Sequence, residues 1–287
     1  GCLSSPNQME RDSNQISHAQ QPKNAMSTSS PAALDEASIF DAVQEMYEAV
    51  AATPTEEFHF PTGRSSCLSL GYPEEVLNTL PTSAIESFAG VGYPFLADAI
   101  EPGDAVVDVG SGSGVDALIA GQKTGPDGLV YGIDMTPAMI AKAETNIREA
   151  GLDHVSILEG RADDLPLDDA SVDVLTSNGV FNLVPDKDTA FREAHRVLRP
   201  RGRIQIADIV LSEPVSEESK ADPELWAECI VGAEPEDEYL HLVRSAGFED
   251  IAVIDRLDYF ARSADESTRK VAKGLGARTI VFTAKKQ

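Results

Sequence analysis

Cysteine is scarce in this sequence: Cys2, Cys67 and Cys229 are the only three among 287 residues. They form no CxxC pair and no cluster with histidine, so the sequence predicts no zinc or other metal site. Sparse thiols are typical of a reducing compartment, and we therefore expect a cytoplasmic protein. Long apolar runs are lacking as well, since none approaches the ~20 residues that a membrane-spanning helix needs.

Positive charge is also in short supply. The chain has 23 lysines and arginines against 48 aspartates and glutamates, and a formal net charge of -25. A surface of this sign repels the phosphates of nucleic acids, so we expect no nucleic-acid partner. The composition fits a protein that acts on a small-molecule substrate, and it does not indicate an oligomeric state.

Residues 1–37 are rich in serine, asparagine, glutamine and proline. Such a segment cannot bury enough apolar surface to order itself, so we predict a disordered tail. Its first residues read G-C-L-S-S, which fits myristoylation of Gly1 and palmitoylation of Cys2 if a methionine precedes them. We expect membrane contact only if this lipidation occurs. The alternative is an arbitrary start, with Met9 or Met26 as the initiator.

Residues 38–98 predict a helical cap. Apolar side chains recur at helical spacing from Ile39 to Val50, and two proline-led segments predict two further short helices. Residues 99–287 then alternate apolar strands with helical segments, which indicates βαβ units and a parallel sheet. The last two strands have no convincing helix between them, so we expect one to run antiparallel at the end of the sheet. An acidic, irregular stretch near 212–240 predicts a cap-like insertion.

The stretch V-V-D-V-G-S-G-S-G-V-D, residues 106–116, is the strongest local signal. Its glycines stand between a predicted strand and a predicted helix, where they allow a sharp turn and a close approach of ligand to backbone. The G-x-G-x-G spacing disfavours a nicotinamide dinucleotide, and the absence of a Walker lysine disfavours phosphoryl transfer. Asp134 ends the next strand, where a carboxylate can bridge two ribose hydroxyls. Together these features predict a nucleoside site.

Residues 106–114, the I-D pair at 133–134, G-R-A-D-D-L-P and R-V-L-R-P-R-G-R resemble class I S-adenosylmethionine-dependent methyltransferases. The resemblance covers the chain from about Phe40 onward. It implies an α/β, doubly wound, Rossmann-like fold with a mostly parallel seven-stranded sheet, N-terminal helices and a small C-terminal extension. It also implies S-adenosyl-L-methionine as the cofactor, with Asp134 on the ribose and with Ala162 and Asp163 beside the adenine.

The predicted cofactor-binding residues lie at or just after the ends of strands. Asn178 is included because it follows the fourth strand, at the carboxyl edge where ligands bind in such sheets. The full set is Asp108, Gly110, Ser111, Gly112, Gly114, Asp134, Met135, Ala162, Asp163 and Asn178.

Longer stretches, among them G-Y-P-E-E, G-V-G-Y-P, S-N-G-V-F-N-L-V-P-D-K and C-I-V-G-A, resemble arsenite methyltransferases. That resemblance implies three cysteines, at the positions of Val91, Gly179 and Cys229, and only the third is a cysteine here. Trivalent arsenic is soft and binds thiolates, so a single thiolate gives no chelate. We therefore expect S-adenosylmethionine-dependent methyl transfer to a small molecule by a protein that has lost most of the metalloid ligands.

Two alternatives stay open. Cys67 could pair with Cys229 in a two-thiol site for arsenite or methylarsenite, or the chain could bind the cofactor without catalysis. No catalytic residue is assigned, and the weak candidates are Cys229, as a thiol that contacts substrate, and His59, as a general base. Tyr47 and Tyr72 could line the active site, since the N-terminal helices of the resembling family cover the cofactor.

Overall fold

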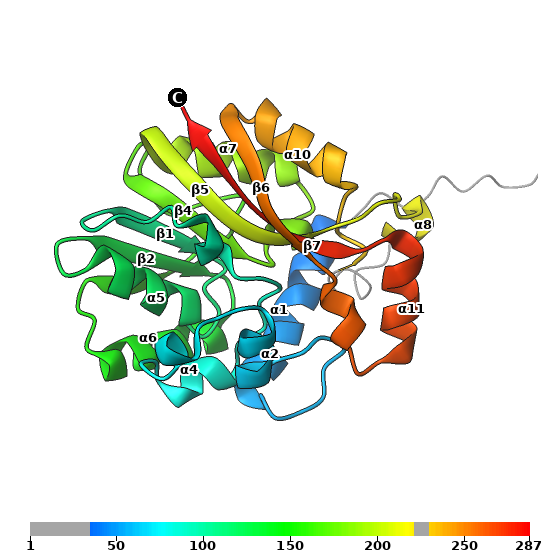
Figure 1. The fold of residues 1–287 in the computed structure, drawn as a ribbon, viewed down its shortest axis with the longest axis horizontal. Coiled ribbons are helices and arrows are strands. Elements are labelled where there is room, and N and C mark those ends of the chain that lie inside the picture. The colour runs from blue at the N-terminus through cyan, green and yellow to red at the C-terminus, as the bar shows by residue number, and fades with distance from the viewer. Residues whose placement is uncertain (1–34, 221–229) are drawn as a thin grey trace, which may run out of the picture. The chain divides into compact units, whose positions relative to one another are not determined.

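The computed structural model describes residues 35–220 and 230–287. Within them, seven strands form one sheet in the order β3-β2-β1-β4-β5-β7-β6 (Figure 1). The strands are β1 (Ala105–Val109), β2 (Leu129–Asp134), β3 (Val155–Glu159), β4 (Val172–Asn178), β5 (Leu198–Val210), β6 (Phe248–Leu257) and β7 (Arg278–Lys286). The first five pair in parallel, whereas β7 runs antiparallel to both β5 and β6. This confirms the predicted doubly wound, mostly parallel seven-stranded sheet.

Helices cover both faces of the sheet (Figure 1). Helices α5 (Val115–Thr124) and α6 (Pro137–Ala150) pack against β1, β2 and β3, whereas α7 (Lys187–Val197) packs on β5 and α10 (Glu236–Ser245) packs on α7 and β6. The strand β1 is buried along its whole length, and alternate residues serve the two cores: Val106 belongs to one, Val107 and Val109 to the other. A parallel strand that is buried on both faces reads as a continuous apolar run, as this one does.

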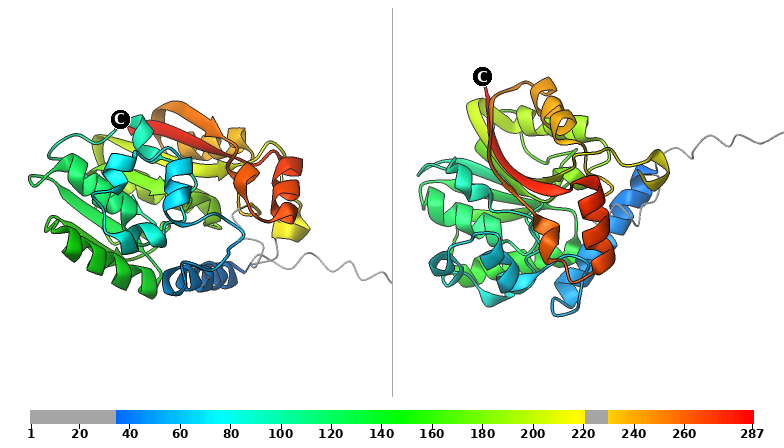
Figure 2. Two further views of the ribbon diagram at one scale, coloured as in Figure 1. Left: turned by 60° about the horizontal axis from the view of Figure 1, so that its bottom comes forward. Right: turned by 45° about the vertical axis from the view of Figure 1, so that its right-hand side comes forward.

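The N-terminal segment forms short helices, and α1 (Glu36–Ala52) lies beside α6 (Figure 2). The others are α2 (Gly63–Ser69), α3 (Glu74–Leu77), α4 (Thr82–Glu86) and the 3-10 turn η1 (Pro94–Ala97). Helix α1 begins at Glu36, one residue before the predicted end of the tail at residue 37. Residues 1–34, with the lipidation pattern, lie outside the described residues. The prolines that were expected to open α3 and α4 occupy their N-cap positions instead.

The last part of the sheet differs from one expectation. A crossover between β6 and β7 is present, made of the 3-10 turn η3 (Tyr259–Arg262) and helix α11 (Glu266–Leu275), although the sequence shows no convincing helix there. An antiparallel strand at the end of the sheet was expected; β7 is antiparallel, but it lies between β5 and β6, so the edge strand is β6. Around the predicted insertion near 212–240, the structure describes a short helix α8 (Glu217–Lys220) and the start of α10. The division into tail, cap and catalytic domain stays a prediction.

Candidate cofactor site

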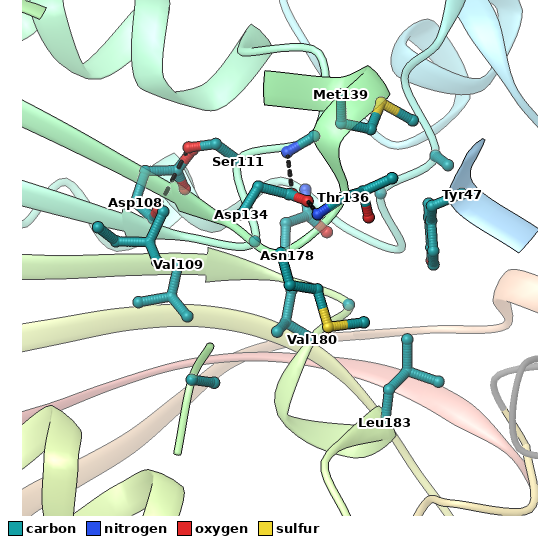
Figure 3. A pocket seen from close by; sticks show the side chains of 18 of the residues that line it. Tyr47, Asp108, Val109, Ser111, Asp134, Thr136, Met139, Asn178, Val180 and Leu183 are labelled. Carbon is teal, nitrogen blue, oxygen red and sulfur yellow. Dashed lines mark hydrogen bonds between the residues drawn. The ribbon is translucent and has the colours of Figure 1, made fainter. Parts of the chain in front are cut away.

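A cavity lies where β1, β2 and β4 end (Figure 3). Its walls come from α1, the segment 87–90, the turn between β1 and α5, the residues that follow β2 and β3, and the segment 178–184. The cavity therefore lies at the carboxyl edge of the parallel strands, where ligands bind in open α/β sheets.

The glycine-rich turn between β1 and α5 forms one side of the cavity. Gly110 and Gly112 have φ angles of +72° and +53°, in the left-handed region that favours glycine. A Cβ atom on Gly110 would lie 2.2 Å from Cγ2 of Val180, so even alanine does not fit there. A Cβ atom on Gly112 would meet no atom within 4 Å, which leaves open space beside the backbone for a ligand.

Asp134 faces the same cavity from the end of β2 (Figure 3). Its Oδ2 accepts a hydrogen bond of 2.8 Å from the amide of Gly112, and its Oδ1 accepts one of 2.9 Å from the amide of Thr136. Burial raises the pKa of this carboxyl group, and the backbone donors oppose that shift. The two amides fix the orientation of the carboxylate, while each oxygen keeps a lone pair for a further donor such as a ribose hydroxyl.

Most of the other predicted cofactor residues also line the cavity. Met135 follows Asp134, and Ala162 follows β3 and is 6% exposed. Asp108 and Ser111 lie at the base of the glycine turn, where the Ser111 hydroxyl donates to Oδ2 of Asp108 at 2.7 Å. Their part in binding the cofactor stays a prediction.

Two members of the set do not line the cavity. Gly114 opens α5 as its N-cap, and a Cβ atom there would meet Ala143 of α6 at 3.4 Å, so its place is structural. Asp163 forms a bidentate ion pair with Arg161, at 2.9 and 2.7 Å. Arg161 is the residue of this pair that lines the cavity, and its guanidinium lies 3.9 Å from the centre of the Phe40 ring. The sequence signal for Arg161 was its place in G-R-A-D-D.

Asn178 lines the cavity and also holds a neighbouring loop. Its Oδ1 accepts hydrogen bonds from the amides of Val91 and Gly92, at 2.8 and 3.2 Å, and its Nδ2 donates to the carbonyl of Gly92 at 2.9 Å. The same Nδ2 lies 3.0 Å from Oδ2 of Asp116 and 3.0 Å from the hydroxyl of Tyr72. One amide side chain therefore ties the end of β4 to the loop at 91–92.

Asp116 is a cavity residue that the sequence analysis missed. It lies in the first turn of α5, is 6% exposed, and accepts a hydrogen bond of 2.6 Å from the hydroxyl of Tyr72. Burial raises the pKa of Asp116 to about 6, and the hydrogen bonds from Tyr72 and Asn178 oppose that shift. Only its position after the glycines could have pointed to it, because Tyr72 and Asn178 are 44 and 62 residues away in the chain.

The N-terminal helix α1 supplies an apolar wall of the cavity, made of Phe40, Val43 and Tyr47. Tyr47 lines the cavity as expected, and Figure 3 shows it on the side opposite Asp108. Tyr72 was expected to line it too, but its side chain is 2% exposed and packs between Phe88 and Tyr93. The helical spacing predicted α1, and the resemblance implied that the N-terminal helices cover the cofactor; which side chains of α1 face the cavity is known only from the structure.

The structure describes only one of the two weak catalytic candidates. His59 does not line the cavity; its ring packs edge-on against Phe60, and its carbonyl accepts from Ser263. Cys229 lies outside the described residues. Cys67 is fully buried in α2, and burial, followed by the negative charge of Asp116, raises the pKa of its thiol to about 12. Within residues 35–220 and 230–287, no group of three or more histidine, cysteine, aspartate or glutamate side chains could hold a metal ion.

Three comparisons with known proteins bear on this site. The family model described as "Methyltransferase domain" matches residues 100–247. An arsenite methyltransferase from Halobacterium salinarum is 36% identical over 211 residues, which are 74% of this chain and 52% of that protein. Another, from Aquipseudomonas alcaligenes, is 37% identical over 171 residues, 57% of this chain and 49% of that protein. The crystal structure of an arsenic(III) S-adenosylmethionine methyltransferase from Chlamydomonas reinhardtii matches with a TM-score of 0.59 and 29% identity, over 78% of this chain and 74% of that one.

The chain belongs to the class I S-adenosylmethionine-dependent methyltransferases. It spans about half the length of the curated relatives it matches. The cofactor of this family is S-adenosylmethionine, and the cavity fits it. An open space lies beside Gly112, a buried carboxylate is oriented at Asp134, and a small side chain, Ala162, lies on the wall where the adenine is expected.

The two positions where the resemblance to arsenite methyltransferases implies cysteines that are missing here lie side by side. A Cβ atom on Gly179 would lie 3.1 Å from Cγ1 of Val91, although the two residues belong to different segments. Val91 is 1% exposed, and Gly179 lines the cavity with a φ angle of +73°. The place where two thiols would meet therefore holds one isopropyl group and no second side chain.

The loop that carries Val91 is supported by β7 from behind. The hydroxyl of Thr279 donates to the carbonyl of Val91 at 2.7 Å across a sequence separation of 188 residues. A Cβ atom on Gly92 would lie 2.7 Å from Cβ of Ala207 in β5 and 3.0 Å from Cγ2 of Thr279, so glycine is required for the loop to approach the sheet this closely. Hydrogen bonds with Asn178 at the end of β4 and with Thr279 in β7 therefore fix the position of the loop.

Proposed function

We propose that this chain transfers the methyl group of S-adenosylmethionine to a small-molecule acceptor. The observation that carries the proposal is one cavity in which the glycine turn and Asp134 face an apolar wall made by α1 and by residues 180–184. The first part suits a nucleoside with a charged tail, and the second suits an apolar acceptor. The family membership supports the reaction class, and the activity itself is the proposal.

The residues of the chain have three tasks in this reaction. When bound, the cofactor supplies a methyl group on a positively charged sulfur, which is already a strong electrophile. The glycine turn and Asp134 would hold the cofactor, and Phe40, Val43 and Tyr47 would exclude water from the cavity. Holding a nucleophile and an electrophile in line within a dry cavity lowers the barrier by removing their freedom to misalign.

We propose an organic acceptor in place of a three-thiol arsenic complex. Val91 and Gly179 offer no thiolate at the two positions where the resembling family has cysteines, and soft metalloid binding needs converging thiolates. The walls nearest these positions carry Phe88, Val180 and Leu183. They favour an acceptor with apolar surface over a polar or highly charged one.

Methylation of arsenite or methylarsenite through Cys67 and Cys229 is the second candidate, and the names of the matched relatives favour it. The burial of Cys67 argues against it. A thiol with a pKa of about 12 is almost entirely protonated at neutral pH, whereas the thiolate is the form that binds metalloids. A third candidate, a protein that binds the cofactor without catalysis, predicts tight binding and no turnover.

Methyl transfer from labelled S-adenosylmethionine distinguishes these candidates. The acceptors are arsenite and methylarsenite with excess glutathione, and in parallel a panel of phenols, thiols and amines. We expect turnover with at least one organic acceptor and none with the two arsenicals. Turnover with arsenite that is lost in Cys229→Ser would establish the second candidate, and cofactor binding with no turnover on any acceptor would establish the third.

The expectations about cellular location, nucleic-acid binding and lipidation stay predictions. No helix in the described residues is long and apolar enough to cross a membrane. A cytoplasmic location and the lack of a nucleic-acid partner rest on the sparse cysteines and on the net charge of -25. Lipidation at Gly1 and Cys2 is tested by mass spectrometry of the protein isolated from its own cell.

A further inference from the structure

The cavity holds more carboxyl groups than ribose recognition requires. Besides Asp134, it is lined by Asp108 on β1 and Asp116 on α5, which are 1% and 6% exposed. Among the cavity-lining residues that the structure describes, Arg161 is the one cationic side chain, and its guanidinium is paired with Asp163. Buried carboxylates without a cationic partner are costly, so a cationic ligand would repay that cost.

Asp116 is the carboxylate whose surroundings fix its position most firmly. Its Oδ1 accepts from the Tyr72 hydroxyl at 2.6 Å, and its Oδ2 accepts from Nδ2 of Asn178 at 3.0 Å. Tyr72 is in turn held between the rings of Phe88 and Tyr93, with centroid distances of 5.1 and 4.5 Å. Both donors are neutral, so they orient the carboxylate without cancelling its charge.

The place of Asp116 also separates it from the ribose end of the cavity. Its partner Asn178 directly precedes Gly179 and binds the amide of Val91, the two positions where the family's acceptor cysteines are expected. Asp134 lies instead at the end of β2, on the opposite side of β1 from β4, the strand that ends at Asn178. Asp116 therefore lies between the ribose carboxylate and the acceptor wall, which is where the reacting sulfur of the cofactor belongs.

We propose that Asp116 recognises the positive charge on the sulfur of S-adenosylmethionine, so that the chain binds this cofactor more tightly than S-adenosylhomocysteine. The inference rests on the proposed function, because it takes this cavity as the cofactor site. Cofactor and product share the adenosine, the ammonium and the carboxylate, and they differ at the sulfur, which is cationic in one and neutral in the other. A fixed negative charge beside the sulfur favours the first and aids release of the second.

The proposal also predicts a dependence on pH. Burial raises the pKa of Asp116 to about 6, so the carboxylate loses its charge as the pH falls through that value. The titratable groups that face it are Tyr72, Cys67, Tyr93 and Asp108, and burial together with the negative charge of Asp116 raises the pKa of each. We expect the affinity for S-adenosylmethionine to fall between pH 7.5 and pH 5.5, and the affinity for S-adenosylhomocysteine to fall much less.

The test is isothermal titration calorimetry of the full chain and of Asp116→Asn with both ligands at pH 7.5. We expect the substitution to lower the affinity for S-adenosylmethionine by at least about tenfold and that for S-adenosylhomocysteine by less than about threefold. The reason is that opposite charges a few ångströms apart attract strongly in a site with an effective dielectric constant of ~20. Asp116→Glu keeps the charge and should keep the preference. Asp127→Asn removes an exposed charge from the loop before β2 and should change neither affinity.

Equal losses for the two ligands would overturn the proposal, because Asp116 would then be a structural residue or a partner of the ammonium that both ligands carry. If Asp116→Asn does not fold, the wild-type chain decides: a ratio of the two affinities that is constant from pH 7.5 to pH 5.5 overturns the proposal, and a falling ratio supports it. If neither ligand binds the wild-type chain, the proposed function fails as well, so the two failures are distinguishable.

Discussion

The two halves of the cavity are built in different ways. The cofactor half, made of the glycine turn at 110–114 and Asp134, comes from one βαβ unit that is continuous in the chain, and its backbone amides bind its carboxylate directly. The acceptor half, made of the loop at 88–92 and residues 178–184, joins segments that lie almost ninety residues apart through one asparagine side chain. The cofactor half is thus specified by local sequence, whereas the acceptor half is assembled only in the folded chain.

The largest expected loss of cofactor affinity is at Gly110, in the cofactor half. In Gly110→Ala the new Cβ atom would lie 2.2 Å from Cγ2 of Val180, at a φ angle of +72°. Left-handed strain and overpacking together cost about 2–5 kcal/mol, so we expect cofactor affinity to fall at least about 30-fold in calorimetry. The matched control is Gly103→Ala, which has a φ angle of +88° and no atom within 4 Å of its Cβ position. It should show a similar backbone cost in thermal unfolding and unchanged cofactor affinity; equal affinity loss in both variants would contradict the assignment.

Asp134→Ala should give the next largest effect. It removes the acceptor of the Gly112 and Thr136 amides together with the expected ribose contact, and hydrogen bonds to a charged group are worth about 1.5–3 kcal/mol. We expect a loss of cofactor affinity of about 10- to 100-fold by calorimetry. Asp134→Asn, which keeps one acceptor oxygen, should fall between this variant and the wild type. Wild-type affinity in Asp134→Ala would remove this residue from the cofactor half.

The acceptor half is tested by placing thiols at the two positions where the resembling family has cysteines. In the double variant Val91→Cys, Gly179→Cys we expect binding of trivalent arsenic, because the two side chains start from adjacent positions. The left-handed φ angle of +73° at Gly179 should lower the stability by about 1–2 kcal/mol. Arsenite titration followed by ultraviolet absorbance and by mass spectrometry measures the binding. The serine double variant at the same positions is the control, and arsenite bound equally by both would show that the thiols do not meet.

Cys67 should give the smallest effect. Because burial raises the pKa of its thiol to about 12, the fraction present as thiolate at pH 8 is negligible, and it grows only as the pH approaches that value. We expect iodoacetamide to label Cys67 slowly in the folded chain and rapidly in urea, as measured by mass spectrometry of the digested protein. Cys67→Ala should leave the methyl-transfer profile unchanged. Rapid labelling of Cys67 in the folded chain would contradict this prediction and support the two-thiol site.

Much of the cofactor half could be predicted from the sequence. The glycine turn, Asp108, Ser111 and Asp134 follow from a short continuous motif, because a strand, a turn and a helix place neighbouring residues together in space. The same locality led to the inclusion of Asp163, which is adjacent to Ala162 in the chain, but its carboxylate pairs with Arg161 and does not line the cavity.

The rest could not be predicted for physical reasons. Asp116 is part of a buried cluster with Tyr72 and Asn178, and only tertiary packing brings the three together. Helix α2 is too short to show a helical period. Helix α11 is amphipathic, but only Thr268 and Ala272 of its ten residues are buried. Local pattern therefore indicates the sheet and the helices α1, α3 and α4, and it misses α2 and α11.

The hydrogen bond from Thr279 to Val91 means that the acceptor half needs β7, which the ribosome synthesises after all the other described strands. Every residue of the cofactor half has been translated well over a hundred residues before β7 leaves the exit tunnel. A nascent chain that ends before β7 already contains the whole glycine turn and Asp134. In that chain the loop at 88–92 still lacks its hydrogen bond to Thr279 of β7. Cofactor affinity should thus arise earlier in translation than acceptor specificity, and ribosome-bound chains arrested before and after β7 would differ in the second property alone.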